Sequence, residues 1–376
     1  MPALPATAAS DPLPAPGAVS GRLVSLDALR GFDMIWILGG DFVVRSLRDV
    51  RDSAATRALA AQMEHCEWAG FHFYDLIFPL FVFMVGIALV FSLRRMLARA
   101  GRAATLKRIV VRSAVLFLLG IFYMGGVANG FKNMYFAGVL HRIAVAYFFS
   151  ALLFCFLRAR TLTLICAGLL AGYWALLTFV PVPGLGAPSL TEPGRNLAHY
   201  LDELCLPGQR FEGTLLSSMA AVANCLLGVF AGLLLENERI APQRKVYGLL
   251  GGGMAALAAG FAWAREFPII KLLWTSSYVL VACGYSALLL AVFYQVIELW
   301  RWRRWAQPFV WIGMNALPIY IVANVVNFRR VAERFVGGDI KVLLGRYGEL
   351  VVGLVGLGLV LWVVNFLYRR RIFLRL

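Results

Sequence analysis

The fold is decided by the stretch HCEWAGFHFYDLIFPLFVFMVGIALVFSL, residues 65–93. Its second half is an apolar run of about the length that one membrane-spanning helix needs, about 20 residues. Its first half places His65, His72 and Asp75 where the chain enters the membrane. A carboxylate in an apolar segment is costly and usually has a partner or a task. The stretch therefore predicts a membrane helix with a site at its mouth. The alternative is a solvated loop followed by a helix with a satisfied Asp near its end.

The composition places the whole chain in the same class. Of its 376 residues, 61% are hydrophobic and 15% are charged, and the mean hydropathy is +0.75. A soluble domain carries about 25% charged residues, so these values indicate a polytopic membrane protein. The formal net charge is +16, but the basic residues lie mostly in short clusters between apolar runs. Cytoplasmic loops of membrane proteins have this pattern, so we expect no nucleic-acid partner.

Apolar stretches of spanning length recur along the chain and predict an all-α bundle of about ten transmembrane helices. The densest basic cluster, 94–108, marks the cytoplasmic side by the positive-inside rule, and it implies that both termini are cytoplasmic. Residues 1–20 are rich in Pro and Ala and predict a disordered cytoplasmic tail, ahead of one transmembrane domain over 21–376. The basic segment 328–346 falls on the outer side and does not fit this rule. The expected spans are about 24–44, 72–93, 109–128, 137–157, 161–180, 213–235, 246–264, 273–297, 308–327 and 348–368.

This topology brings ionisable residues from several helices to the outer mouth of the bundle. Inside a bundle such groups line a cavity or a pathway and avoid lipid. The residues expected there are His65, His72, Asp75, Asp41, His141, Arg142, Glu212, Lys271 and Trp274.

The residue types at the mouth suit acyl transfer. A His of near-neutral pKa can serve as general base for an amine or hydroxyl, and Asp75 or Asp41 could orient its ring. Arg142, Lys271 or Asn315 could stabilise an oxyanion. A His can also carry the acyl group itself, and a proton-coupled transporter would use the same residue types. The six cysteines form no CxxC or Cys/His ligand spacing, so we expect no metal.

A set of short motifs occurs in this chain in the order found in one family. The motifs resemble those of the heparan-α-glucosaminide N-acetyltransferase family, which belongs to a wider group of transmembrane acyltransferases, and the resemblance runs from about Leu23 to the C-terminus. Two positions depart from it: Ala69 stands where the family commonly has Asn, and Asp41 stands in place of an Asn that the lysosomal enzyme has in the outer part of the first span. The motifs are SLDALRG (25–31), HCEWAG (65–70) with DLIFP (75–79), GVLHR (138–142), EG (212–213), KLLWTSSY (271–278) and GMN (313–315).

The resemblance implies an acetyltransferase of the bacterial inner membrane. Acetyl-CoA would enter from the cytoplasm, and the acceptor would be the amine of glucosamine, or of a saccharide that bears it, on the outer side. His65 would be the catalytic residue, and Trp68 would stack on the sugar or the thioester. The expected substrate-binding residues are Trp68, His141, Arg142, Glu212, Lys271, Trp274 and Asn315.

Two further expectations concern partners. Phosphates need Arg or Lys, so the CoA nucleotide is expected near Arg30 at the inner mouth. The alternative is that Arg30 simply pairs with Asp27 or Asp33 on its own helix. The bilayer is the expected surrounding, and a homodimer is left open.

Overall fold

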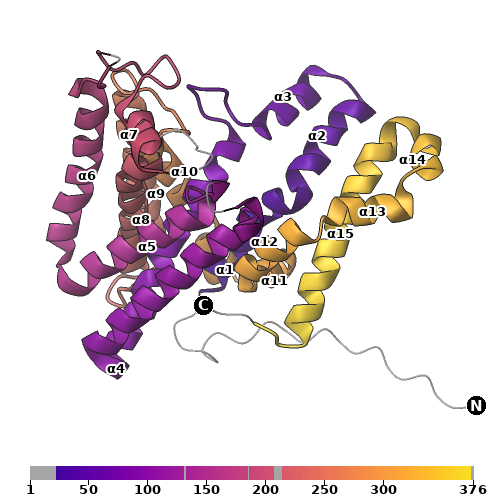
Figure 1. The fold of residues 1–376 in the computed structure, drawn as a ribbon. Helices are drawn as coiled ribbons and strands as arrows, with labels where there is room; N and C mark the ends of the chain where they lie inside the picture. Colours follow the sequence, from indigo (N-terminus) through magenta and orange to yellow (C-terminus); the bar gives the residue numbers. More distant parts are fainter. Residues whose placement is uncertain (1–22, 131–132, 185, 207–213, 374–376) are drawn as a thin grey trace, which may run out of the picture.

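The computed structural model describes residues 23–373 apart from 131–132, 185 and 207–213, and helices make up most of this part of the chain (Figure 1). These described residues contain no β-strand, only two isolated bridges. The expected all-α class is therefore confirmed. The expected tail, 1–20, and Glu212 lie outside the described residues.

The α-helices vary from a single turn to a long kinked element. In chain order they are α1 (Val24–Ile35), α2 (Asp41–Val50), α3 (Ala54–Gln62), α4 (Ile77–Tyr123), α5 (Val139–Phe156), α6 (Ala159–Phe179), α7 (Leu197–Cys205), α8 (Thr214–Glu236), α9 (Pro242–Trp263), α10 (Ser276–Tyr294), α11 (Gln307–Met314), α12 (Ala316–Val325), α13 (Phe328–Val336), α14 (Asp339–Leu343) and α15 (Gly348–Arg369).

Seven helices among the described residues are long and apolar enough to cross a membrane. The number rises to eight if the pair 304–314 and 316–325, bent by 69°, forms one span. A polytopic helical protein is thus confirmed, whereas the expected count of about ten is not reproduced. Two predicted spans, 72–93 and 109–128, lie on one of the seven helices, 73–123. The first predicted span is broken into the short helices α1 and α2 by a π-turn, in which Gly39 has φ 123°.

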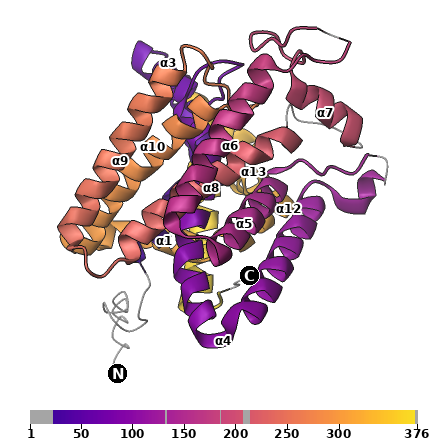
Figure 2. The ribbon, with the colours of Figure 1, turned by 90° about the vertical axis from the view of Figure 1, so that its left-hand side faces the viewer.

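The long helix α4 is a hairpin of two arms (Figure 2). Its 47 residues would extend about 70 Å if straight, more than twice the hydrocarbon thickness of a bilayer. Gly101 interrupts it with φ 75° and ψ −178°, a backbone conformation that is open to Gly and strained for other residues. The turn falls within the basic cluster 94–108, so the two arms correspond to the two spans expected on either side of that cluster.

The core is packed around the first arm of α4. This arm lies against α8 so closely that a Cβ on Gly86 would come within 2.0 Å of the Cys225 carbonyl oxygen. A Cβ on Gly228 would in turn come within 2.0 Å of the Phe83 carbonyl oxygen. Small residues allow this backbone approach, which drives helix association in a bilayer. The contact fixes the arm that directly follows Asp75.

Figure 1 shows two groups of helices that meet near α1, α11 and α12. One group holds α4–α10, and the other holds α2 and α13–α15. Helix α1 packs on α11 and also contacts α4 and α10. The site described next lies at this junction, because most of its lining residues come from α1, α4, α5 and α12, from the segment before α4 and from the segment between α9 and α10.

Candidate active site

The Asp75 carboxylate organises the loop that precedes α4. Asp75 lies in a short 3-10 helix (Phe73–Leu76) and is fully buried. Its Oδ2 accepts the backbone N–H groups of Cys66 (3.3 Å) and His72 (3.0 Å). The backbone carbonyl of Asp75 accepts the Tyr278 hydroxyl at 2.8 Å. Because a buried charge needs such partners, the loop 66–72 wraps around this carboxylate.

The other carboxylate oxygen faces His65 and Lys271. His65 Nδ1 lies 2.9 Å from Asp75 Oδ1, and Lys271 Nζ lies 3.3 Å from the same oxygen. Lys271 Nζ is also 2.6 Å from His65 Nδ1 and 2.9 Å from Nε2. We call these three residues the His65 cluster. They join a carboxylate, an imidazole and an amine within hydrogen-bonding distance, so protons can pass among them.

Backbone pairing brings Lys271 to His65 across more than 200 residues of sequence. Gly70 N–H donates to the Ile269 carbonyl at 2.9 Å, and Ala69 forms an isolated bridge with Ile270. Gly70 has φ 138°, where other side chains are strained. The Thr275 hydroxyl accepts the Ile270 N–H at 3.0 Å, which holds the segment as it turns into α10. The HCEWAG motif and the KLLW motif thus form one structural unit.

Burial shifts the pKa of the Lys271 amine and the pKa of the Cys66 thiol in opposite directions. Burial lowers the pKa of Lys271 to about 8, and the Asp75 carboxylate opposes that shift. Burial, followed by the charge of Asp75, raises the pKa of the Cys66 thiol to about 11. Lys271 therefore titrates near physiological pH, and Cys66 remains a neutral thiol.

One group of three possible metal ligands occurs among the described residues. The ligand atoms of Cys66, His72 and Asp75 lie within 4.8 Å of one another. The thiol is protonated, and both Asp75 oxygens already accept protein donors. His72 Nδ1 also lies 3.0 Å from the Glu64 carbonyl oxygen. Metal binding needs a thiolate and free lone pairs. These three residues instead have a neutral thiol and lone pairs that already accept hydrogen bonds, so they are better suited to holding the loop together than to binding a cation.

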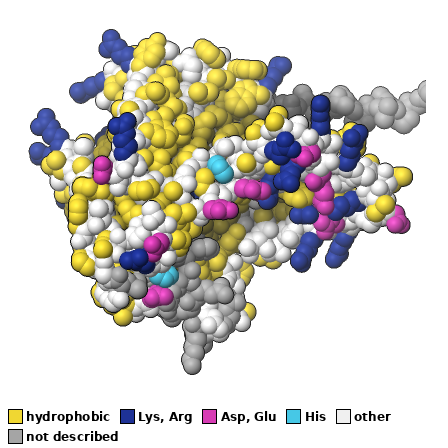
Figure 3. Space-filling view, turned by 90° about the horizontal axis from the view of Figure 1, so that it is seen from above, with side chains coloured by type: hydrophobic (Ala, Val, Ile, Leu, Met, Phe, Trp, Pro, Cys, Tyr) yellow, Lys and Arg dark blue, Asp and Glu magenta, His cyan; other side chains and the backbone are white. Residues whose placement is uncertain are grey.

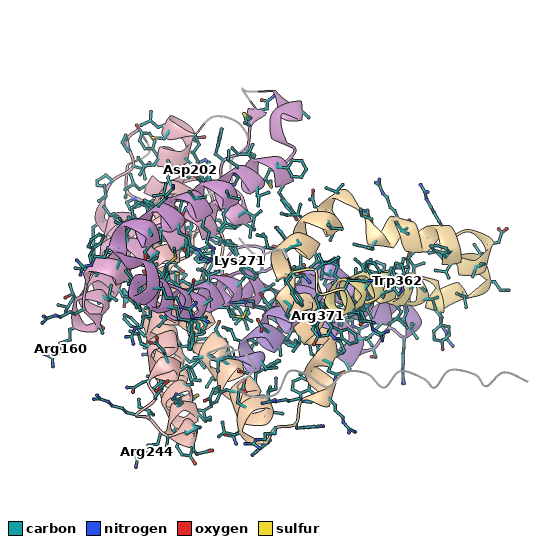
Figure 4. All side chains as sticks on the ribbon, turned by 90° about the horizontal axis from the view of Figure 1, so that it is seen from below. Arg160, Asp202, Arg244, Lys271, Trp362 and Arg371 are labelled. Atoms are coloured by element: carbon teal, nitrogen blue, oxygen red, sulfur yellow. The ribbon has the colours of Figure 1, made fainter. Side chains whose placement is uncertain are left out.

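The His65 cluster opens into a cavity of about 400 Å³. Its walls are mostly apolar and aromatic, and the basic side chains that line it are His65, Lys271 and Arg142. Figure 4 places Lys271 near the centre of the molecule, between the two groups of helices, whereas Arg160 and Arg244 lie at the edge. The lining residues are Met34, Ile37, His65, Tyr74, Ile77, Phe78, Phe81, Tyr123, Ala137, Gly138, Val139, Leu140, Arg142, Ile143, Lys271, Leu272, Trp274, Ala316, Leu317 and Tyr320.

Arg142 supplies a second cation to the cavity. Its side chain is almost fully buried, and Nη2 donates to the Ser217 hydroxyl at 3.0 Å. The guanidinium lies over Trp274 at 4.9 Å and Phe78 at 5.9 Å from the ring centroids. Such stacking stabilises a desolvated guanidinium. The geometry holds a rigid positive charge at the cavity wall and leaves Arg142 Nε without a partner among the described residues.

Four residues expected in the site thus meet at the cavity: His65, Arg142, Lys271 and Trp274. Asp75 stands directly behind them. Figure 3 shows a face of the molecule on which histidine and acidic side chains lie between apolar areas.

Other expected residues lie outside the cavity lining. Trp68 donates its indole N–H to the Leu190 carbonyl at 2.6 Å and so ties down the long loop after α6. Asp41 pairs with Arg45 at 2.6 Å on α2. His141 Nδ1 accepts the Gly138 N–H at 3.1 Å at the start of α5.

The last two expected residues lie on the helices α1 and α11–α12. Asn315 is buried at the break between α11 and α12. Its N–H donates to the Ile312 carbonyl at the end of α11, and its carbonyl accepts the Ile319 N–H in the first turn of α12. Arg30 Nη1 lies 3.4 Å from Asp27 Oδ1, which is the pairing considered as the alternative to CoA binding.

Two tyrosines near the cluster were missed by the motif reasoning. The Tyr74 ring lies against the His65 ring, with centroids 4.8 Å apart. Tyr278 holds the Asp75 backbone from the first turn of α10. A usable signal existed for both, because Tyr74 adjoins Asp75 and Tyr278 ends the KLLWTSSY motif.

Comparisons with known proteins agree with the motif resemblance. Residues 22–202 match the family model described as heparan-alpha-glucosaminide N-acetyltransferase, catalytic. A curated Mus musculus protein named heparan-alpha-glucosaminide N-acetyltransferase is 27% identical, over 70% of this chain and 49% of its own length. The Homo sapiens protein of the same name is 26% identical, over 69% of this chain and 48% of its own length. The chain therefore spans about half the length of these curated relatives.

Proposed function

We propose that this chain, a member of the heparan-α-glucosaminide N-acetyltransferase family, is a transmembrane enzyme that moves an acetyl group from acetyl-CoA to the amine of glucosamine or of a saccharide bearing it. The observation that carries the proposal is the His65–Asp75 pair, at 2.9 Å, opening into an apolar cavity that also holds Lys271 and Arg142. A base, a carboxylate that orients it and nearby cations are the groups that amine acylation needs.

In this mechanism His65 is the general base. Asp75 Oδ1 holds the proton of the ring on Nδ1, which leaves the lone pair on Nε2. Once the acceptor amine takes the place of Lys271 Nζ, now 2.9 Å from Nε2, this lone pair takes a proton from the amine as it attacks the thioester carbonyl. The buried carboxylate also stabilises the imidazolium that forms. The C–S bond then breaks, the amide forms, and the proton on the ring can pass to the departing CoA sulfur.

Lys271 and Arg142 would stabilise the negative charge on the thioester oxygen. Both lie at the cavity wall, and neither charge is screened there as it would be in bulk water. The apolar walls suit the acyl end of a thioester and limit water, which would otherwise hydrolyse it. Trp274 keeps the Arg142 guanidinium in place by stacking at 4.9 Å.

The proposal includes a membrane arrangement. Residues 21–376 form the transmembrane acyltransferase domain of a bacterial inner-membrane protein, with both termini cytoplasmic by the positive-inside rule. Acetyl-CoA enters from the cytoplasmic side, where Arg30 binds its phosphates. The sugar binds at the outer mouth, near the His65 cluster, and a homodimer is compatible with this scheme.

The deciding experiment uses the full chain purified in detergent. It is incubated with acetyl-CoA and glucosamine while free thiol and N-acetylated sugar are followed together. Equal amounts of both products would support the proposal. A sugar or proton-coupled transporter, the competing class, would bind or move its cargo without releasing CoA, so the absence of both products would contradict the proposal.

A further inference from the structure

We propose that Lys271 is itself an acyl acceptor, so that its Nζ takes the acetyl group from an acyl thioester in the cavity when no sugar amine is bound. This inference rests on the proposed function, since it needs the same thioester at the same base. It adds a modification site and a means by which the enzyme's activity would respond to its acceptor.

The position of Lys271 carries the argument. Its Nζ lies 2.6 Å and 2.9 Å from the two ring nitrogens of His65, within reach of the base that would activate an acceptor amine. Lys271 lines the cavity. Among the described residues that line it, no other side chain carries a primary amine. The protein thus holds an amine of its own where the sugar amine has to lie.

The reaction balances without any other reagent. The Lys271 amine attacks the thioester carbonyl and loses one proton, through His65, to the sulfur. The C–S bond breaks as the C–N bond forms, and the products are N-acetyl-lysine and the free thiol of CoA. No oxidant, reductant or metal takes part.

The cluster would make this reaction slower than transfer to a sugar. Lys271 Nζ lies 3.3 Å from the buried Asp75 carboxylate, an ion pair that keeps much of the amine protonated. Because burial lowers the pKa of Lys271 to about 8, the neutral amine is the minor form at pH 7 and the major form at pH 9. A sugar amine bound in the cavity competes for the same carbonyl and protects the lysine.

Acetylation would change the site permanently. The amide is neutral, so Asp75 would lose its contact with a cation, and the added acetyl group would occupy cavity volume beside His65. Turnover should fall in proportion to the fraction of protein modified. An acetyl group on His65 would behave differently, since an acyl imidazole is hydrolysed and reacts with hydroxylamine, whereas an amide survives both.

Two of the other described lysines, Lys245 and Lys341, offer internal controls. Lys245 donates to the Leu235 carbonyl at 2.6 Å, where α8 ends and α9 begins, away from the cavity. Lys341 pairs with Glu349 at 2.5 Å near α14. The partner of each of these amines is a carbonyl or a carboxylate, whereas Lys271 lies against the His65 ring.

The experiment incubates the purified full chain with acetyl-CoA alone, at pH 7 and pH 9, and measures intact mass and peptide fragments over time. We expect one stable acetyl group on Lys271, formed faster at pH 9 and suppressed at least tenfold by saturating glucosamine. Lys271→Arg should abolish it, His65→Gln should slow it at least tenfold, and Lys245→Arg should leave it in place.

Three outcomes would overturn the inference. They are no stable adduct, an adduct that hydroxylamine removes, and an adduct spread evenly over the lysines. The proposed function is read separately from thiol release with glucosamine in the same preparation. Turnover without a Lys271 adduct would reject this inference alone, and the absence of any turnover would reject the proposed function.

Discussion

Replacing Asp75 with Asn tests the geometry of the His65 cluster with a change of almost no volume. In the native protein Oδ2 accepts two backbone N–H groups and Oδ1 faces His65 and Lys271. An amide has one oxygen, so its NH2 group must face one of these two sets of donors. The backbone N–H groups cannot move away, and leaving both unpaired costs about 1–3 kcal/mol each. We therefore expect the amide oxygen to stay with the backbone.

The NH2 group of the substituted amide would then donate to His65 Nδ1. The ring would be forced into the tautomer that carries its proton on Nε2, and that nitrogen could no longer accept a proton from the acceptor. Loss of the carboxylate also removes the stabilisation of the imidazolium. A wrong tautomer and a lost counter-charge together are worth about 10²–10⁴-fold in turnover.

The assay is thiol release with saturating acetyl-CoA and glucosamine, compared with the matched variant Asp41→Asn. Asp41 was the second carboxylate expected to orient His65, but it pairs with Arg45 on α2. That pair is partly exposed and contributes about 1 kcal/mol or less, so we expect activity within about threefold of wild type. An Asp75→Asn protein that is folded and also within about threefold of wild type would refute the reasoning.

Three other perturbations test the cations around the site. Arg142→Lys should lower kcat/KM about 10–100-fold in the thiol assay, because an ammonium cannot both stack on Trp274 and donate to Ser217; unchanged kinetics would remove Arg142 from the site. Lys271 loses its charge as pH rises through about 8, so turnover should fall there if the ammonium stabilises the oxyanion. Lys271→Arg should move this fall to higher pH, because Arg keeps its charge; an identical pH profile in this variant would argue against that role. Arg30→Ala should raise the KM for acetyl-CoA more than the KM for the sugar. An unchanged KM for acetyl-CoA would remove Arg30 from the CoA site and favour its pairing with Asp27 on α1.

The helical class could be read from the sequence because apolar runs of spanning length leave few alternatives in a bilayer. The number of spans was harder to predict. The residues beside Gly101, Ala100 and Arg102, do not signal a turn in the sequence. Only the structure shows the positive φ that folds α4 into two arms. Gly39 breaks the first span in the same way. Hydropathy measures how apolar a segment is, and it does not record where the backbone turns.

The candidate site was predicted in part for a similar reason. Motifs identified His65, Asp75, Arg142 and Lys271, but their order along the chain does not say which of them touch. The contact of His65 with Lys271 depends on Gly70 pairing with Ile269, a backbone interaction with no periodic signal.

Polar residues that bond to backbone groups at helix ends and in loops were the hardest to assign. His141 was expected at the sugar, and in the structure its Nδ1 accepts the N–H of Gly138, the residue before α5. Trp68 lies in the loop before α4 and donates to the Leu190 carbonyl in the loop after α6. Helix ends and loops leave backbone groups unpaired, and these attract the same residue types as an active site does, so sequence alone cannot separate the two uses. The roles of both residues in substrate binding stay predictions.

The central claim is that His65 activates the acceptor amine, and His65→Ala tests it most directly. His72→Ala is its control, because His72 contributes to the cluster through its backbone N–H while its ring lies 3.0 Å from the Glu64 carbonyl oxygen. We predict that His65→Ala extracts and binds acetyl-CoA as wild type does, yet loses at least about 10²-fold in N-acetylated glucosamine formed. His72→Ala should retain most of the activity. A His65→Ala enzyme that forms the product at a rate near that of wild type would contradict the claim.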